Sequence, residues 1–301
     1  MYRIPQHRGR DTNSYLISTR IPCSIFNMNN LNLKNSPLGN TVAYISEYDP
    51  SLLFPIPRKI KRDEISVPVE LPFFGVDIWN AFELSWLNEK GKPNVAIAQI
   101  TFPCELPFLI ESKSLKLYFN SFNQTKIATA EEVRETIERD LSEAAGGDVL
   151  VTIQTASDFA SQQIQELDGI SIDNEDVSIE QYKIERSYLR VSDETVEETL
   201  QSQLLKSNCL VTGQPDWASL QIRYKGPKID RKGLLKYIIS FRQHNEFHEQ
   251  CIERIFMDIA QLCRAEKLSV YGRYTRRGGL DINPFRSNFE KKPDNIRTSR
   301  Q

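Results

Sequence analysis

The sequence predicts an α+β fold, with antiparallel sheets that carry their helices on one face. Two observations support this. Stretches with strand character alternate with amphipathic helical stretches, and the second half of the chain repeats the order of the first. The chain has 301 residues, of which 40% are hydrophobic and 26% charged. This ordinary composition provides enough apolar material for a core without disulfides or metal ions.

The elements of the first half follow one another closely. Residues 95–102 are rich in β-branched side chains and residues 114–121 partly alternate between apolar and polar, so both are expected to be strands. Residues 129–141 begin with a Thr and early acids and then place an apolar side chain at every fourth position, which predicts a helix. Two glycines end that helix, and residues 149–153 form the next expected strand.

The second half shows the same order. Residues 217–224 have strand character, residues 234–241 form a second apolar stretch, residues 246–262 predict a long helix, and residues 268–274 a final strand before a Gly-Gly turn. A shift of 119 positions gives six identities in twelve aligned residues: Lys113 with Lys232, Leu115 with Leu234, Tyr118 with Tyr237, Ser121 with Ser240, Phe122 with Phe241 and Gln124 with Gln243. We therefore expect two copies of a strand–strand–helix–strand module.

This pattern divides the chain into four parts. A loose N-terminal arm, rich in Asn, Ser and Arg, is expected first, followed by one module, an acidic linker with the start of the second module, and the rest of that module. The expected boundaries are 1–37, 38–157, 158–200 and 201–301. Several prolines and the basic run 58–62 indicate that residues 38–65 are an extended segment rather than a regular element. Open sheet edges favour side-by-side assembly, so a homo-oligomer is expected.

Charge and cysteine content exclude several classes of protein. The net charge is -2, so no global field attracts nucleic acid or membrane. No apolar run approaches the roughly 20 residues of a membrane span, and the N-terminus has no signal-peptide core, so a cytoplasmic protein is expected. The cysteines have wide spacing without a CxxC pair, which favours free thiols over a disulfide framework or zinc ribbon; they are Cys23, Cys104, Cys209, Cys251 and Cys263.

Cys209 is a candidate nucleophile. It precedes a turn, residues 213–216, and a thiol near such a turn can be exposed and polarised. Asp216 lies close in sequence and could return towards the thiol as a proton donor. The alternative, that Cys209 is a small core residue, stays open at this point.

Two of the three histidines, His244 and His248, lie four positions apart and would share one face of a helix. Together with nearby acids they could bind zinc, but no third ligand is apparent, so no metal site is expected. His248 with Glu249 is a better acid/base and hydrogen-bonding pair. A solvated helix start, with acids at the positive end of the helix dipole, explains the same residues.

Two further clusters suit an anionic or purine-like ligand. The stretch Glu111–Tyr118 combines a carboxylate, hydroxyl groups and two lysines, although a charged loop at a strand start would look similar. Arg276 and Arg277 beside two glycines could approach a phosphate, although they could equally form a basic hairpin tip. The chain has neither a GxGxxG motif after a strand nor a Walker lysine loop, so a nicotinamide cofactor would bind outside a Rossmann site.

Taken together, these stretches resemble the NADPH-dependent 7-cyano-7-deazaguanine reductases, the nitrile reductases of queuosine biosynthesis. The resemblance covers residues 38–288, and the segments that carry it are 111–125, Cys209 with 214–217, 247–249 and 276–284, with 52–58, 77–80 and 83–86 resembling the long, two-module form. It implies two tandem tunnelling-fold modules, a homodimer, and a site formed between modules. The N-terminal arm is longer than the family leads us to expect.

The resemblance also implies roles for individual residues. Cys209 would attack the nitrile to give a covalent thioimide, Asp216 would protonate the nitrogen, and His248 would assist proton transfer. The substrate would be held by Glu111, Ser112, Phe247 and Glu249, and the phosphates of NADPH by Lys113, Lys116, Arg276 and Arg277. Two NADPH would convert one nitrile to 7-aminomethyl-7-deazaguanine, for tRNA modification. Cys104, Cys251 and Cys263 match no functional motif and are expected to be buried structural thiols.

Two rival functions use the same fold. A cyclohydrolase-type hydrolase would need a zinc site, and the sequence lacks its cysteine and histidine ligands. A non-catalytic purine-binding or tRNA-contacting module would favour a basic stripe, which the sequence also lacks.

Overall fold

The computed structural model describes residues 44–301, so the expected arm, residues 1–37, and the start of the first module at residue 38 lie outside the described residues. The α-helices and strands are β1 (Pro55–Pro57), α1 (Arg58–Glu64), β2 (Phe74–Leu87), β3 (Pro93–Pro103), β4 (Phe108–Ile110), α2 (Ser112–Ser121), α3 (Ala130–Ala145), β5 (Leu150–Thr155), β6 (Ile170–Ser171), β7 (Val191–Asn208), β8 (Pro215–Ile229), α4 (Arg231–Ser240), α5 (His248–Leu262), β9 (Lys267–Tyr274) and β10 (Leu280–Ser287). Short 3₁₀ helices are η2 (Pro50–Leu52), η3 (Ala156–Ser161), η4 (Arg186–Tyr188) and η5 (Phe241–Gln243).

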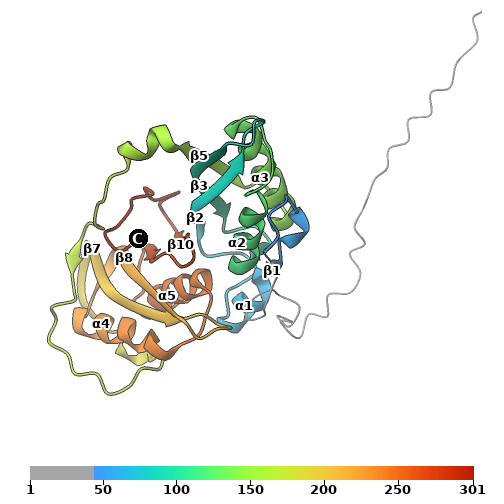
Figure 1. The fold of residues 1–301 in the computed structure, drawn as a ribbon. Coiled ribbons are helices and arrows are strands. Elements are labelled where there is room, and N and C mark those ends of the chain that lie inside the picture. The colour runs from blue at the N-terminus through green and yellow to red at the C-terminus, as the bar shows by residue number, and fades with distance from the viewer. Residues whose placement is uncertain (1–43) are drawn as a thin grey trace, which may run out of the picture. The chain divides into compact units, whose positions relative to one another are not determined.

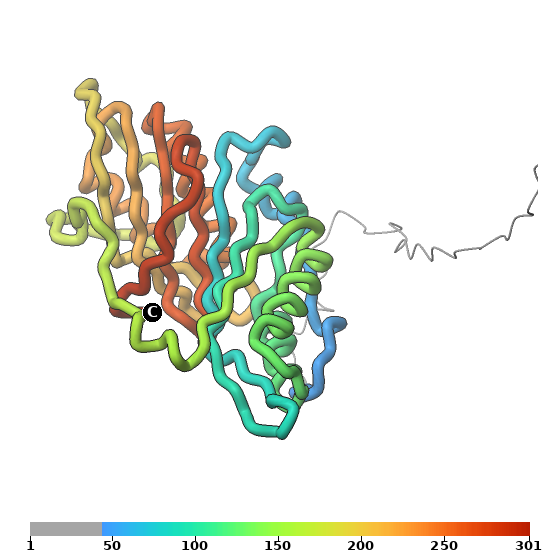
Figure 2. Tube along the Cα trace, turned by 90° about the horizontal axis from the view of Figure 1, so that it is seen from above, coloured from blue at the N-terminus to red at the C-terminus, as the bar shows by residue number. Residues whose placement is uncertain are grey.

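One continuous sheet joins the two halves of the described chain. Its strand order is β5-β3-β2-β10-β9-β8-β7-β6, and all neighbours are antiparallel except β6 and β7. The last strand of the second half, β10, pairs with the first long strand of the first half, β2, over eight residues from Leu280–Ala81 to Ser287–Phe74. Figure 2 shows the strands of both halves running side by side. The predicted α+β class with antiparallel pairing is confirmed.

The main hydrophobic cores lie on the helix side of this sheet (Figure 1). In the first half, Trp79 and Ala81 of β2 pack with residues of α2 and α3, because alternate strand residues point to the same face. In the second half, Leu268 and Val270 of β9 pack with residues of α4 and α5. A small third cluster lies on the opposite face around Phe285.

The predicted repeat is visible at the level of single hydrogen bonds. Tyr118 Oη of α2 donates to Asp140 Oδ2 of α3 at 2.7 Å, and Tyr237 Oη of α4 donates to Asp258 Oδ2 of α5 at 2.6 Å. Three residues after each tyrosine a serine donates to that tyrosine's carbonyl oxygen, at 2.6 Å in both halves. Each half therefore builds the same helix pair from the same side chains, which confirms the tandem modules. Their exact boundaries stay a prediction, and β7 runs across the one expected at residue 200.

The predicted strand at residues 114–121 is wrong. These residues form α2, and the matching stretch of the second half forms α4, so the module is strand–strand–helix–helix–strand. Glu111 caps α2 by accepting from the backbone of Lys113 and Ser114, and the buried Leu115 and Tyr118 follow at helical spacing.

Two further expectations need correction. Residues 55–64, expected to be irregular, form β1 and α1, and β1 pairs with β4. The strand at 267–274 is not the last, because β10 follows the Gly-Gly turn and lies in the middle of the sheet. Between residues 44 and 301, no helix has both the length and the apolar character needed to cross a bilayer.

Candidate active site

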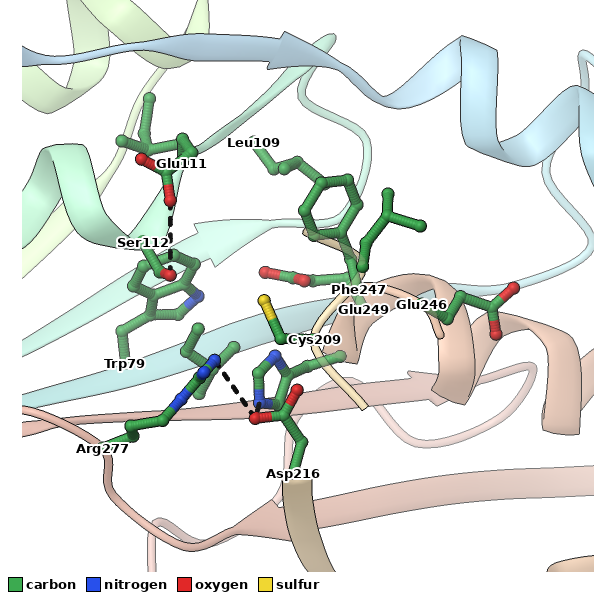
Figure 3. A pocket seen from close by; sticks show the side chains of 14 residues that line it. Trp79, Leu109, Glu111, Ser112, Cys209, Asp216, Glu246, Phe247, Glu249 and Arg277 are labelled. Atoms are coloured by element: carbon green, nitrogen blue, oxygen red, sulfur yellow. Dashed lines mark hydrogen bonds and ion pairs between the residues drawn. The ribbon is translucent and has the colours of Figure 1, made fainter. Parts of the chain in front are cut away.

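A cavity lies where the two modules meet, at the paired strands β2 and β10. Residues of both halves line it (Figure 3). The first half contributes Trp79, Leu109, Ile110, Glu111 and Ser112, and the second contributes Cys209, Leu210, Asp216, Glu246, Phe247, His248, Glu249, Arg277 and Ile282. The structure thus brings eight of the eleven predicted catalytic, substrate and cofactor residues, Arg277 among them, into one cavity within a single chain.

Cys209 is held at this cavity by the backbone on both sides of it. Its N–H donates to the carbonyl of Gln214 at 2.8 Å and its own carbonyl accepts from Gly213 at 3.0 Å, which closes the turn between β7 and β8. Asn208, one residue earlier, exchanges backbone hydrogen bonds with His244 and Glu246 at 2.8 and 3.1 Å. This ties the turn to the segment that leads into α5. The sulfur therefore lies beside the N-terminus of α5, and only 7% of the residue is exposed.

The surroundings of Cys209 favour the thiolate. Burial alone would raise the pKa of the thiol, but hydrogen bonds from the hydroxyl and backbone of Thr212, from the backbone of Val211 and from Arg277 outweigh it and lower that pKa below the usual value. Cys104, Cys251 and Cys263 lack a comparable set of hydrogen-bond donors, so burial dominates and raises the pKa of each. All three are buried free thiols, as predicted.

Asp216, His248 and Arg277 form a polar group next to the thiol. Asp216 Oδ1 lies 3.2 Å from Arg277 Nη2 and 3.6 Å from His248 Nε2. The imidazole packs edge-to-face on Tyr274, with ring centroids 4.2 Å apart. Burial lowers the pKa of His248 to about 4, against the opposing charge of Asp216, so the ring is neutral at neutral pH. The second carboxylate oxygen of Asp216 is buried and has no hydrogen-bond partner among the described residues.

The opposite walls of the cavity carry two buried carboxyl groups, one from each module. Glu111 is the N-cap of α2, and its two oxygens accept from the backbone N–H groups of Lys113 and Ser114 at 2.7 and 2.8 Å. Burial nevertheless raises the pKa of Glu111. Glu249, in the first turn of α5, points towards Cys209 (Figure 3), and burial followed by the nearby charge of Asp77 raises its pKa to about 7.

Two buried polar atoms at this cavity lack partners among residues 44–301, in addition to the Asp216 oxygen. They are Glu249 Oε1, an acceptor, and Trp79 Nε1, a donor. Buried polar groups are seldom left unpaired, so such atoms indicate where a polar ligand binds. Phe247 supplies an aromatic wall beside them and caps α5 without a side-chain hydrogen bond. The set suits a flat, aromatic ligand with N–H donors and acceptors on its edges.

A smaller cavity adjoins the first and shares Ser112, His248, Arg277 and Ile282 with it. Lys116 also lines it, and burial followed by the neighbouring Arg277 charge lowers the pKa of Lys116. A bound phosphate would offset the repulsion between these two positive charges. Lys113 and Arg276 line neither cavity. Arg276 instead lies over the Phe82 ring at 4.3 Å and donates to the Gln301 carbonyl at 3.0 Å.

His244 and Glu246 do not contribute to a metal site. His244 lies before α5, so it does not share a helix face with His248 as the spacing suggested. Glu246 points away from the thiol (Figure 3) and pairs with Arg254 at 2.5 Å. Over the described residues, no group of three or more His, Cys, Asp or Glu side chains is arranged to hold a metal ion.

Comparison with known proteins agrees with this geometry. Residues 44–153 match a family model described as "Nitrile reductase, 7-cyano-7-deazaguanine-reductase N-term", and residues 215–293 match one described as "QueF-like protein". A protein of Cupriavidus metallidurans named NADPH-dependent 7-cyano-7-deazaguanine reductase is 59% identical over 89% of this chain and 99% of its own length. A Bordetella pertussis protein of the same name is 56% identical over 90% of this chain and 100% of its own length.

The chain belongs to the 7-cyano-7-deazaguanine reductase family. Membership confirms the resemblance drawn from the motifs. Sequence reasoning nevertheless missed several residues that line the cavity in this member of the reductase family, namely Trp79, Leu109, Ile110, Leu210 and Ile282. Trp79 lies inside the stretch 77–80, and its indole between the polar Asp77 and Asn80 was the signal that could have been followed.

Proposed function

We propose that this chain is an oxidoreductase of queuosine biosynthesis that reduces the nitrile of 7-cyano-7-deazaguanine to an aminomethyl group with NADPH. The supporting observation is the position of the Cys209 thiol. It shares one cavity with two buried carboxyl groups, Glu111 and Glu249, which come from different modules. A nucleophile between two hydrogen-bond acceptors suits a purine-like base that carries an electrophilic carbon.

Cys209 is proposed to form the covalent bond to substrate. Its thiolate adds to the nitrile carbon and forms a C–S bond, while one π-electron pair of the C≡N group moves to nitrogen, which takes up a proton. Hydrogen bonds from Thr212 and Arg277 lower the pKa of Cys209 and so raise the thiolate fraction at neutral pH. The product of this step is a thioimide.

Asp216 and His248 are proposed to move protons at this carbon–nitrogen bond. The partner-free oxygen of Asp216 lies at the cavity and can deliver a proton to the nitrogen. The His248 ring is neutral at rest and its Nε2 lies 3.6 Å from the other oxygen, so it can relay a proton to Asp216 by giving up a proton at Nε2 while Nδ1 takes one up from water; the ring ends neutral and adds no second buried positive charge beside Arg277. Together, these two side chains supply protons to the nitrogen as the nitrile is converted to an amine.

The deazapurine is proposed to lie between the two modules. Glu249 Oε1 accepts from one N–H edge of the base, Glu111 from another, and Ser112 adds a contact, with the ring packed on Phe247. The arrangement orients the nitrile towards Cys209, because two acceptors on opposite walls fix a flat base in its plane.

NADPH, when bound, supplies hydride to the substrate carbon, and a nitrile needs two such additions to become an amine. Lys116 and Arg277 are the residues proposed to hold its phosphates, since both cations line the adjoining cavity. Lys113 and Arg276 are proposed as outer contacts. Between the two reductions the C–S bond breaks, and the thiolate of Cys209 is regenerated.

Intact-mass measurement tests the proposal. Protein mixed with 7-cyano-7-deazaguanine in the absence of NADPH should gain the full mass of the ligand, because addition to a nitrile releases no leaving group. The Cys209→Ala variant should show no gain, and Cys263→Ala, which removes a buried thiol outside the cavity, should behave as the wild type. An adduct that persists in Cys209→Ala would exclude the proposed nucleophile.

We also infer a cytoplasmic homodimer. Strand β5 is an edge of the sheet, and Leu150 on it is 59% exposed. An exposed apolar edge favours pairing with another copy. Light scattering should give twice the chain mass, and Leu150→Lys should weaken this association, whereas Leu262→Lys on α5 should not. A wild-type mass equal to one chain would exclude the dimer.

A further inference from the structure

Two sequence motifs that the proposed chemistry does not use meet inside the protein. Arg58 ends the stretch 52–58, and Asp77 begins the stretch 77–80. Arg58 Nη2 donates to Asp77 Oδ2 at 2.6 Å, and their side chains are 3% and 1% exposed. Arg286 of β10 contacts the other oxygen of Asp77 at 2.8 Å. An ion group this deeply buried is costly to desolvate and is seldom explained by stability alone.

Helix α1, which carries Arg58, connects the two walls of the catalytic cavity. On the first-module side, the Arg58 N–H donates to the Pro107 carbonyl at 2.9 Å, and β1 pairs with β4, which leads directly into Glu111. On the second-module side, Gln250 Nε2 donates to the Lys61 carbonyl at 3.0 Å. Gln250 immediately follows Glu249 in α5. The helix therefore links the segment that leads into Glu111 to the first turn of α5, which carries Glu249.

Arg58 and Glu249 both carry buried polar atoms that lack hydrogen-bond partners among the described residues. Arg58 Nε and Nη1 are buried donors without a hydrogen-bond acceptor among the described residues, and Glu249 Oε1 is a buried acceptor without a donor. Such atoms are rare in protein interiors, and here they occur on two opposite charges that act on each other.

We propose that Arg58 is a positioning residue for Glu249: its charge favours the ionised form of that carboxyl group, the form that accepts hydrogen bonds from the substrate, and Asp77 opposes it. The inference rests on the proposed function, because it assigns Glu249 to substrate binding. Arg58 itself does not line the cavity and is not proposed to touch substrate.

Other charges around Glu249 do not replace Arg58. Arg286 also favours the ionised form, but it is shared between Asp77 and Glu253, at 2.8 and 2.9 Å. Glu253 is paired as well with Arg62 at 2.6 Å. The other titratable or charged groups that line the cavity with Glu249 are Glu111, Cys209, Asp216, Glu246, His248 and Arg277, and Glu246 is paired with Arg254. The proposal therefore predicts opposite effects for removal of the Arg58 and Asp77 charges.

The test is the KM for 7-cyano-7-deazaguanine between pH 6 and 8 in Arg58→Met, Arg58→Lys and Asp77→Asn. Glu249 has a pKa of about 7 in the wild type. A change of one unit, the low end of what a neighbouring charge does, raises the KM of Arg58→Met about ninefold at pH 6, about fivefold at pH 7 and about twofold at pH 8. Arg58→Lys retains the charge and should keep most of the wild-type pH profile.

Asp77→Asn should act in the other direction, with KM about fivefold lower at pH 6 and unchanged at pH 8. In each active variant kcat should change less than KM, since Arg58 does not touch the reacting atoms. Lys59→Met is the matched control, because Lys59 lies on the same helix, is 63% exposed and pairs only with Asp63 among the ion pairs of the described chain. Its profile should equal that of the wild type.

A KM ratio that does not vary with pH, or shifts of the same sign in Arg58→Met and Asp77→Asn, would overturn the inference. If Arg58→Met does not fold, Asp77→Asn decides, and an unchanged profile in that variant rejects the role. A wild-type protein that oxidises no NADPH with this nitrile would overturn the proposed function instead.

Discussion

Adjacent residues His248 and Glu249 should oppose each other in the pH dependence of stability. Both are in the first turn of α5 and both are buried at the cavity. Burial lowers the pKa of His248 from 6.5 to about 4 and raises the pKa of Glu249 from 4.5 to about 7. Each group is therefore neutral in the folded protein over a range in which it is charged in the unfolded chain.

The two contributions have opposite signs and similar size. Between pH 4 and 6.5 the unfolded chain binds more protons at His248, so this group's contribution is lost as pH falls through that window. Between pH 4.5 and 7 the folded protein binds more protons at Glu249, so this group's contribution is lost as pH rises through that window. Each change spans about 2.5 units, or on the order of 3 kcal/mol. From pH 4.5 to 6.5 they nearly cancel.

The assay is urea unfolding of His248→Gln, Glu249→Gln and the wild type at pH 4.5, 5.5 and 7. Relative to the wild type, the free energy of unfolding of His248→Gln should increase by about 3 kcal/mol as pH falls from 7 towards 4. That of Glu249→Gln should increase by about 3 kcal/mol as pH rises from 4.5 to 7. Groups common to all three proteins drop out of these differences. Parallel curves for the two variants would refute the lowered pKa of His248 and the raised pKa of Glu249.

Three other predictions concern single contacts. Thr212→Val removes a hydroxyl that lowers the pKa of Cys209, so iodoacetamide should alkylate Cys209 several-fold more slowly at pH 7, with the rates converging above pH 9; equal rates at pH 7 would contradict this. Tyr118→Phe deletes the 2.7 Å hydrogen bond to Asp140 and should lower the free energy of unfolding in urea by about 1–2 kcal/mol. Gly146→Ala should cost about 1–2 kcal/mol in the same assay, because the residue has φ +78° and the new Cβ would lie 2.8 Å from a proline side chain; a stabilised variant would refute that account.

The helix pairs were only half predictable from the sequence. The predicted helix at 129–141 corresponds to α3, because Thr129 caps it and Gly146 ends it in a left-handed conformation. The stretch that forms α2 was taken as a strand. In Leu115-Lys-Leu-Tyr-Phe119 the apolar residues fit a period of 2 as well as one of 3.6, so the pattern does not decide. The side-chain cap by Glu111 decides it, and that cap depends on backbone geometry.

Strand β10 could not be predicted from hydrophobic pattern. Asp281, Asn283 and Arg286 are all buried in this strand, and Pro284 has no backbone N–H to donate to a neighbouring strand. Their partners come from distant parts of the chain. Asn283 Nδ2, for example, donates to the Ile78 carbonyl at 3.0 Å, across 205 positions. Such polar residues can be buried only because distant parts of the chain satisfy their hydrogen bonds. In the sequence alone, they resemble a loop. Eight residues of the cavity, by contrast, were named from their motifs, but their meeting within one chain depends on the β2–β10 pairing.

The two modules explain why Cys209 has donors available. In the first module, Asn88 occupies the start of the β2–β3 turn, and its Oδ1 accepts from the N–H groups two and four positions later, at 3.0 and 2.9 Å. In the second module Cys209 stands at the start of the β7–β8 turn, and its sulfur accepts from the N–H groups two and three positions later. A turn that must satisfy its own N–H groups stabilises a carboxamide oxygen in one copy and a thiolate in the other. The N–H groups of the turn therefore supply part of the lowered pKa of Cys209, and the Thr212 hydroxyl and Arg277 supply the rest, so no neighbouring general base is needed.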